Sequence, residues 1–527
     1  MTAFDTILRG GHLVDGTGTE PWRGDLGIIG GRIAAIGDLR SAEAGRIVDA
    51  TGRYVLPGFV DAHAHADALL GEPRVQEAYL RQGVTSVIVG QDGLSFAPSN
   101  TASSSWVERY FAAVNGPAPQ SLAGGGSIAE FLDGLDRSGA LNAASLIPAG
   151  LVRATVMGVS DRPATRAELR RMVEYVDLAV DEGAVGLSTG LDYVPGGFAD
   201  TAELIELARP VGERGGVYVS HLRGYARDRI QDSLLEAGHI AARSGAAGHA
   251  SHLHGPADVL ENALEAIERE YGVQLSFDSY PYLRGSTILA MLVLPGSIQS
   301  GGADATLARL GDPEVRRMLR DEAFPSNWRL DSIRLSYLSA PELRWAEGLG
   351  LREAAERFPG DLVDFCCEAL IACDLAVGCV VDNGADRTES DIRRMLGHPG
   401  QMASSDAIFL GSAPHPRGWG AFARLLGRHV RELGDWTWGA AARHLAGHAA
   451  ERFRLPDRGV LVTGAIADLV VLDPETIVDH SDYEHPTRPA TGVDHVIVGG
   501  EFALDGGVIT GSKAGRALRP GDGTHPS

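Results

Sequence analysis

The stretch Gly58-Phe59-Val60-Asp61-Ala62-His63-Ala64-His65 decides the fold, because an apolar run ends there in two histidines. Side chains two positions apart on a strand point to the same side, so both imidazoles can bind one cation. Further short motifs also end apolar runs, and they carry Asp92, His221, His252 and Asp406. In a (β/α)8 barrel the carboxyl ends of all strands meet on one face, which carries the chemistry. The sequence therefore predicts a barrel whose strand ends converge on one or two metal ions.

Between residues 58 and 460, apolar runs alternate with helical stretches, as in a parallel sheet surrounded by helices. The eight runs that we expect in the barrel are Phe59–His63, Thr85–Val89, Ala144–Ile147, Val185–Leu187, Val217–Ser220, Gly248–Ser251, Leu275–Asp278 and Met402–Ser405. Two more strand-like runs, Ile333–Leu338 and Ala376–Val381, fall between the last two. Either one of them belongs to the barrel, or both lie in an insertion within about 285–400 that covers its mouth.

Short strands separated by glycine turns fill residues 1–57, and a matching set returns in residues 461–527. Neither set is long enough to form a stable sheet alone. We therefore expect an α/β protein with a small β-sandwich domain built from both termini, and the barrel of residues 58–460 inserted between them. The last dozen residues are rich in glycine, proline, serine and arginine, a composition typical of disorder.

The composition argues against several kinds of partner. A net charge of −22 is unfavourable for binding nucleic acid, whose phosphates attract clusters of lysine and arginine. The longest aliphatic run, Ile288–Leu294, is too short to span a bilayer, and the N-terminus lacks a signal-peptide core. We therefore expect no membrane partner and a cytoplasmic location, and a homo-oligomer remains compatible with the sequence. The four cysteines, which lie between Cys366 and Cys379, lack metal-site spacing, so buried apolar roles are favoured.

The strand-end residues each have a simpler alternative. His63 and His65, taken alone, are equally compatible with two hydrogen-bonded core or surface histidines. His221 and His252 lie one βα repeat apart, so we expect them on adjacent strands that face one cavity; the alternative is two unrelated histidines. Asp406 beside a cation would stay ionised and could take a proton from an activated water, although without the histidines it would be assigned as a loop cap.

Longer segments accompany these strand ends, namely Gly186–Gly196, Ser220–Arg223, Asp278–Tyr282, His415–Phe422, Asp457–Gly459 and Ala467–Pro474. Together with the strand-end ligands, they make the chain resemble the amidohydrolase superfamily over nearly its whole length. More narrowly, it resembles the N-acyl-D-amino-acid deacylase (D-aminoacylase) family. The resemblance implies a zinc-dependent amide hydrolase on a barrel, with a β-domain formed by both termini.

The resemblance also implies a role for each matching residue. His63 and His65 would hold the more exposed metal ion, His221 and His252 would hold the tighter one, and Asp406 would be general base and then general acid. The positions that grip the substrate in the family match Tyr193, Tyr282 and Arg417. An arginine can fork onto a substrate carboxylate, whereas the alternative for Arg417 is a structural ion pair.

Two departures from the family bear on the metal and the substrate. The only lysine, Lys513, lies in the tail, so a carboxylated lysine cannot bridge two metals. The family places a cysteine in a Gly-Asn-Cys-Gly turn, where this chain has Asp92 in Gly90-Gln91-Asp92-Gly93. A carboxylate can bridge cations but is harder than a thiolate, so Mn2+ and Co2+ become as compatible as Zn2+. Asp-Gly is also a common turn pair, so a purely structural Asp92 is the alternative.

The second departure is His254, which stands where the family commonly has a lysine that helps to bind the substrate carboxylate. We expect it to face the site, because it shares the strand side of His252. The expected reaction is hydrolysis of a linear amide in a small molecule, foremost an N-acyl-D-amino acid. Hydrolysis of a cyclic amide or of a D-amino-acid-containing dipeptide is the alternative on the same site. A catalytically silent barrel that acts as a binding protein is the alternative from another class.

Overall fold

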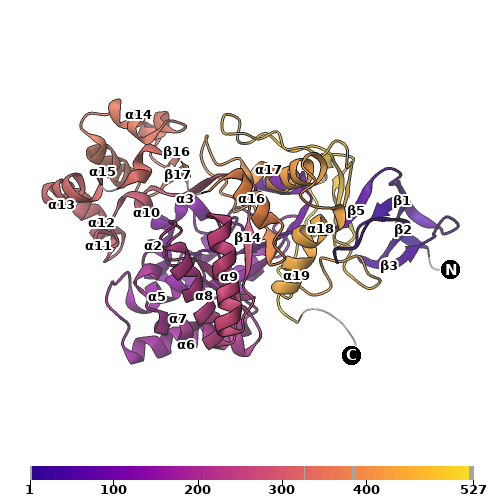
Figure 1. Cartoon of the computed structure of the whole chain (residues 1–527), viewed down its shortest axis with the longest axis horizontal. Coiled ribbons are helices and arrows are strands. Elements are labelled where there is room, and N and C mark those ends of the chain that lie inside the picture. The colour runs from indigo at the N-terminus through magenta and orange to yellow at the C-terminus, as the bar shows by residue number, and fades with distance from the viewer. Residues whose placement is uncertain (1–2, 326, 383–386, 522–527) are drawn as a thin grey trace.

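A parallel barrel occupies the middle of the computed structural model, which describes residues 3–325, 327–382 and 387–521 (Figure 1). Its strands are β6 (Phe59–Asp61), β7 (Val84–Val89), β10 (Asn142–Pro148), β11 (Gly186–Gly190), β12 (Val217–His221), β13 (Ala247–Ala250), β14 (Ser276–Ser279) and β18 (Gln401–Ala403). They pair in the order β18-β14-β13-β12-β11-β10-β7-β6. The eight strands expected from the sequence are therefore confirmed, with ends that differ by a few residues.

Backbone hydrogen bonds between the segments that follow the first and last strands close the barrel. Ala62 N donates to Ala403 O at 3.2 Å, and Asp406 N donates to His63 O at 2.8 Å. The same closure includes a parallel bridge between Ala64 and Ala407. Because the chain closes in this register, Asp406 lies beside the histidine pair, although it follows His65 by 341 residues in sequence.

The connections between and after the strands carry most of the helices. These are α1 (Pro73–Leu80), α2 (Thr101–Tyr110), α3 (Ala112–Asn115), α4 (Ile128–Leu135), α5 (Ala149–Met157), α6 (Arg166–Asp181), α7 (Thr201–Glu213), α8 (Ile230–Ser244), α9 (Ala257–Tyr271), α16 (Glu389–Leu396), α17 (Arg417–Arg424), α18 (Trp438–Ala442) and α19 (His448–Arg452). Local sequence sets their ends: α6 begins with a capping box between Thr165 and Glu168, and α9 ends at Gly272 in a left-handed conformation. Among the described residues, no helix combines the length and apolarity needed to cross a bilayer.

A large insertion separates β14 from β18 and lies on one side of the barrel (Figure 1). It consists of β15 (Arg284–Ile288), α10 (Leu289–Val293), α11 (Gly296–Gln299), α12 (Ala303–Leu310), α13 (Pro313–Met318), β16 (Ile333–Leu338), α14 (Leu351–Glu356), α15 (Leu362–Ala372) and β17 (Val377–Asp382). The three strands form a separate antiparallel sheet in the order β15-β17-β16. Both undecided strand-like runs therefore belong to the insertion. The four cysteines are buried and free, as expected.

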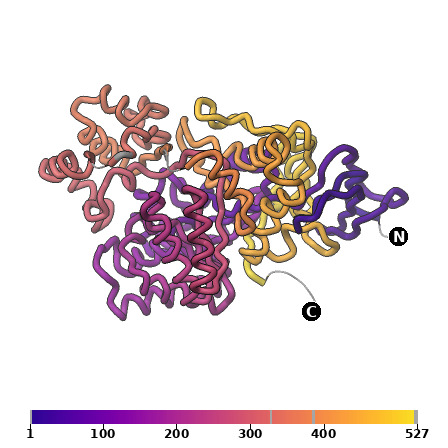
Figure 2. The backbone as a smooth tube through the Cα atoms, in the orientation of Figure 1, coloured from indigo at the N-terminus to yellow at the C-terminus, as the bar shows by residue number. Residues whose placement is uncertain are grey.

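The two termini build one further sheet on the opposite side of the barrel (Figure 1). Its nine strands are β1 (Phe4–Leu13), β2 (Trp22–Ile29), β3 (Arg32–Gly37), β4 (Ala44–Asp49), β5 (Tyr54–Pro57), β19 (Leu469–Leu472), β20 (Val493–Val498), β21 (Glu501–Asp505) and β22 (Val508–Ile509). The two halves join where β5 pairs with β19 in antiparallel register. Figure 2 shows the C-terminal part of the chain, in yellow, returning toward the N-terminal strands. Leu8, Leu26, Leu469 and Ile497 share a core beside this sheet.

The tail corrects one sequence prediction, because part of the segment expected to be disordered is packed. Ala143 N donates to Arg516 O at 2.9 Å, and Leu518 N donates to Ala143 O at 2.8 Å. The tail therefore uses backbone groups that β10 offers near its start, and Leu518 becomes buried. Composition does not reveal such an acceptor. Residues 522–527 of that segment lie outside the described residues.

Candidate metal centre

The structure brings the five predicted metal ligands and the predicted base, Asp406, together at the carboxyl end of the barrel. Each of them ends a strand or follows one closely, and all are buried: His63, His65, Asp92, His221, His252 and Asp406. Five of them form two overlapping groups in which every ligand atom lies within 4.8 Å of the others in its group, and the sixth, His221, lies 3.5 Å from Asp92. One group is His63, Asp92 and His252, and the other is His63, His65 and Asp406. His63 belongs to both.

The turn after β7 aims Asp92 into the barrel. Asp92 itself has a left-handed backbone with φ of 55°, which is uncommon outside glycine and frequent at functional sites. Its neighbours need to be glycine, since a Cβ on Gly90 would lie 2.5 Å from Leu146 O and one on Gly93 would lie 2.7 Å from Gly190 N. His252 and Asp406 also have positive φ. Asp92 is therefore both a turn residue and a residue that faces the histidines.

Each oxygen of Asp92 lies between two imidazoles. Its Oδ1 is 3.6 Å from His63 Nε2 and 3.5 Å from His252 Nε2. Its Oδ2 is 3.6 Å from His65 Nε2 and 3.5 Å from His221 Nδ1. Two atoms bonded to the same tetrahedral zinc ion at about 2.1 Å lie about 3.4 Å apart.

The spacing therefore fits a carboxylate that bridges two cation positions. Asp92 Oδ1 is also buried without a hydrogen-bond partner among the described residues. Buried polar atoms are normally paired, so an unpaired carboxylate oxygen among imidazoles is what a metal site requires. The residues present thus fit zinc, and a donor set of imidazoles and carboxylates also fits Mn2+ and Co2+.

Imidazoles also lie close to one another. His63 Nε2 is 3.3 Å from His65 Nε2, and His221 Nδ1 is 3.0 Å from His252 Nε2. His65 Nδ1 contacts Asn115 Oδ1 at 3.0 Å, so in the neutral imidazole this nitrogen carries the proton and the Nε2 lone pair is directed to the site. Asn115 ends a short helix in the β7–β10 connection, and no pattern in the sequence signals its role.

Carboxylates and imidazoles shift one another's pKa values in this cluster. Burial would raise the pKa of Asp92, but the imidazoles of His221 and His63 hold it well below its usual value. Burial likewise opposes a charge on His65, yet the carboxylates of Asp406 and Asp92 raise its pKa to about 10. Protons on the histidines therefore compete with a cation for the same nitrogens, and metal binding releases them.

Arg417 forms an ion pair with Asp406, and its role as a substrate clamp stays a prediction. The arginine begins α17 and is fully buried, and its Nη1 lies 2.8 Å from Asp406 Oδ2. Burial would raise the pKa of Asp406, but Arg417 holds it below the usual value. The alternative given for this residue, a structural ion pair, therefore describes its position. It leaves Asp406 Oδ1 toward the site, 3.3 Å from His65 Nε2.

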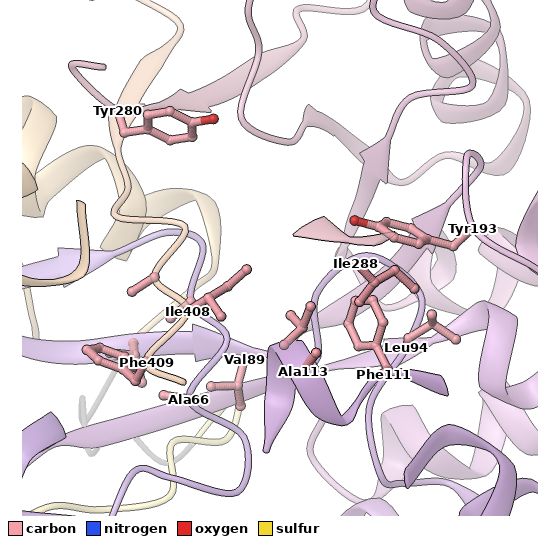
Figure 3. Close-up of a cluster of buried hydrophobic side chains, with 14 of the residues drawn as sticks. Ala66, Val89, Leu94, Phe111, Ala113, Tyr193, Tyr280, Ile288, Ile408 and Phe409 are labelled. Atoms are coloured by element: carbon pink, nitrogen blue, oxygen red, sulfur yellow. The ribbon is translucent and has the colours of Figure 1, made fainter. Parts of the chain in front are cut away.

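A cavity opens above the ligands, with one wall from the barrel and another from the insertion. It is lined by Asp92, His221, His252 and Asp406 below, by Asp192, Tyr193, Tyr225, His254 and Tyr280 at the sides, and by Gly285, Ser286, Thr287, Met291, Leu292, Arg329 and Val381 on the outer side. Figure 3 shows Tyr193 and Tyr280 on opposite sides of a buried cluster, with their hydroxyl groups directed toward the space between them. Tyr193 also contacts Thr287 Oγ1 through its hydroxyl at 2.7 Å.

Tyr282 is not among the residues that line this cavity, and its contact with the substrate stays a prediction. Its ring packs against His415 and lies 5.1 Å from the Arg424 guanidinium. Tyr280, two residues earlier in the same Asp278–Tyr282 segment, takes the place on the wall. The sequence marked the segment but could not distinguish its two tyrosines.

His254 faces the cavity as expected, but in a restrained position. Its ring stacks on Tyr225 with centroids 4.5 Å apart and planes within 6°. Its Nδ1 contacts His252 O at 2.9 Å, and burial lowers its pKa well below the usual value. A neutral His254 cannot replace the charge of the lysine that the family commonly has there.

Comparisons with known proteins agree with this geometry. A family model described as the amidohydrolase family matches residues 46–207 and 353–503. The D-aminoacylase of Alcaligenes xylosoxydans xylosoxydans is 34% identical, over 98% of this chain and 97% of the relative. The crystal structure of N-acyl-D-glutamate deacylase from Bordetella bronchiseptica, with zinc and a phosphonate that mimics the tetrahedral intermediate, superposes with a TM-score of 0.81. It is 31% identical and covers 98% of this chain and 100% of that one.

A D-aminoacylase structure is also similar, with a TM-score of 0.79, 32% identity, and coverage of 98% of this chain and 100% of that one. That protein has a binuclear metal centre in which one metal activates and the second attenuates.

Proposed function

Because the chain belongs to the amidohydrolase family, and within it to the D-aminoacylases, we propose that it removes the acyl group from N-acyl-D-amino acids. One observation carries the proposal: His63, His65, His252, Asp92 and Asp406 form two overlapping groups with the spacing of metal ligands, and His221 lies 3.5 Å from Asp92. The amide-hydrolysing chemistry follows from the family. The D-amino acid comes from the relatives described above, which act on such substrates by name.

Zinc is the cofactor that we propose, as one or two ions, with Mn2+ or Co2+ as replacements. His63, His65, Asp92, His221 and His252 would hold it. Bound there, it supplies a Lewis acid that lowers the pKa of water and polarises the amide carbonyl. Two overlapping ligand groups support two positions, and the hardness of the Asp92 carboxylate makes them less selective for zinc than a thiolate would.

Asp406 moves the proton. Its Oδ2 is held by Arg417, so the carboxylate cannot rotate freely, and its Oδ1 faces the histidines. It accepts the proton of the attacking water and then donates it to the departing amine. Without that donation the amine would have to leave as a strongly basic anion, which is a poor leaving group. One residue therefore serves both halves of the reaction.

The outer wall of the cavity orients the substrate. Met291, Leu292 and Val381 offer apolar surface, and Arg329 lies on the same wall. An N-acyl amino acid needs apolar contact for one end and a cation for its carboxylate. We therefore place the acyl group or side chain against the apolar residues and the carboxylate toward Arg329, with Tyr193 and Tyr280 on the flanks.

The test is amine release from matched N-acetyl-D- and N-acetyl-L-amino acids, with acidic and apolar side chains, in the presence of Zn2+. We expect cleavage of D-forms alone and its loss with a chelator. Asp406→Asn is the matched control, because it keeps the shape of the site and removes the base. Cleavage by that variant at the wild-type rate, or silence on every pair, would overturn the proposal.

A further inference from the structure

A buried chain of polar groups runs beneath the metal centre, through the interior of the barrel. It consists of Ser276 and Asp278 on β14 and His249 on β13, all fully enclosed by the barrel. His249 Nδ1 lies 2.8 Å from Ser276 Oγ, and its Nε2 lies 3.0 Å from Asp278 Oδ2. The same carboxylate oxygen is 3.5 Å from His63 Nδ1. The chain therefore ends on a predicted metal ligand.

The donor and acceptor types give this chain a direction. Ionised Asp278 can only accept, so His249 donates from Nε2 and its Nδ1 accepts from the Ser276 hydroxyl. His63 Nδ1 has no hydrogen-bond partner among the described residues, and Asp278 lies 3.5 Å from it. A proton on Nδ1 is stabilised by that negative charge. The lone pair of His63 is then on Nε2, the nitrogen that faces Asp92 and Asp406.

The two histidines of the pair differ in what supports them. His65 is oriented by the neutral amide of Asn115, whereas His63 faces a carboxylate. A carboxylate behind a ligating imidazole fixes its tautomer and increases its basicity, and losing such a partner typically weakens metal binding about 10–100-fold. His63 is also the residue shared by both candidate ligand groups. The imidazole that faces a charged partner is thus the one that both groups share.

We propose that Asp278, anchored by His249 and Ser276, is the positioning residue for His63 and sets the affinity of the centre for its metal. Asp278 is not among the residues that line the cavity, and it acts through His63. The inference rests on the metal centre of the proposed function, but it concerns metal affinity and needs no assumption about the substrate.

The first experiment measures Zn2+ affinity of the whole protein by chelator competition, without substrate. Asp278→Asn keeps the volume but supplies no negative charge, and we expect the Zn2+ dissociation constant to rise about 10–100-fold. Ser145→Ala is the matched control, since it removes another buried hydroxyl of the barrel wall, one that donates to Leu146 O at 3.0 Å. It should bind Zn2+ as the wild type does. Unchanged affinity in Asp278→Asn would overturn the proposal.

A double-mutant cycle separates positioning from a general effect on the barrel. In the background His63→Asn, the further change Asp278→Asn should have no additional effect on Zn2+ affinity, because the residue acts only through His63. Losses that add in the double variant would contradict the proposal. If Asp278→Asn does not fold, His249→Phe keeps the question answerable. This variant removes only the anchor of Asp278. We expect a smaller loss of Zn2+ affinity than in Asp278→Asn, and no additional loss when it is combined with His63→Asn.

A failure of the proposed function would be distinguishable. The chain could release no amine from any N-acyl amino acid and still show the predicted coupling between Asp278 and His63. Conversely, the wild type could release amine while the effects of Asp278→Asn and His63→Asn on Zn2+ affinity add. That result would overturn only the positioning role of Asp278.

Discussion

Replacing Arg417 with glutamine tests whether this arginine serves Asp406 or the substrate. Its Nη1 lies 2.8 Å from Asp406 Oδ2, and the guanidinium is fully buried. Glutamine keeps much of the bulk and can still donate a hydrogen bond, but it removes the charge. If the arginine serves Asp406, the variant should change the proton transfer and leave substrate binding nearly intact.

The size of the effect follows from the ion pair. Unit charges about 4 Å apart attract by about 4 kcal/mol at an effective dielectric constant of about 20. An adjacent arginine typically lowers the pKa of an aspartate by about 1–3 units. Burial would raise the pKa of Asp406, and Arg417 is the strongest influence that lowers it. Since the base must be ionised, the acid limb of the kcat profile should move up by about 1–3 pH units.

The same substitution should reduce stability, because it leaves a buried carboxylate without its partner. Breaking such a pair costs about 3–5 kcal/mol of unfolding free energy. The lowered pKa of Asp406 means that the pair stabilises the fold above the ordinary aspartate pKa and ceases to do so as pH falls through the lowered one. The difference in unfolding free energy between wild type and variant should therefore be largest at neutral pH and should decrease as the pH falls.

The assay is the pH dependence of kcat and KM on an N-acyl-D-amino acid, with metal in excess. Arg417→Lys is the matched control, because it retains a positive charge and should keep the acid limb close to its wild-type position. A tenfold rise in KM with an unmoved limb in Arg417→Gln would refute the reasoning, since that is the result expected of a carboxylate clamp.

Three further changes probe the rest of the site. Asp406→Asn should lower kcat by about 10²–10⁴ while metal content stays the same by elemental analysis; loss of the metal would place the residue among the ligands instead. Asp92→Cys should raise the preference for Zn2+ over Mn2+ about tenfold in competition binding, and an unchanged preference would exclude Asp92 from the metal contacts. Tyr280→Phe should reduce kcat/KM more than Tyr282→Phe does, because only the first lines the cavity; the reverse order would contradict that assignment.

The barrel could be predicted from the sequence because its signals are local. Each strand is an apolar run of a few residues, and each ligand follows such a run directly. The alternation of apolar runs with helical stretches was therefore enough to predict the barrel. Convergence of His63 with Asp406 needed only the geometry of strand ends in a closed barrel. The family resemblance then supplied the reaction, which strand patterns alone do not contain.

Partners of side chains could not be predicted, because they depend on distances across the fold. The motif that contains Arg417 was evident, yet nothing local indicates that its nearest anion is Asp406. The roles of Asn115 and Asp278 arise from chain segments distant from the histidines they face. The choice between Tyr280 and Tyr282 depends on a local bend, and the insertion strands needed their antiparallel pairing to be seen. Localisation, oligomeric state and the domain boundaries stay predictions.

The sheet shared by the two termini has a consequence for synthesis of the chain. The edge of β5 pairs with β19, which leaves the ribosome more than 400 residues later. Until then the N-terminal strands present an unpaired edge, and the barrel cannot close because β18 is also late. Exposed strand edges promote association between nascent chains. The last strands to be synthesised therefore cover the exposed edges. Chains that stop before these strands should depend on chaperones more than complete chains do.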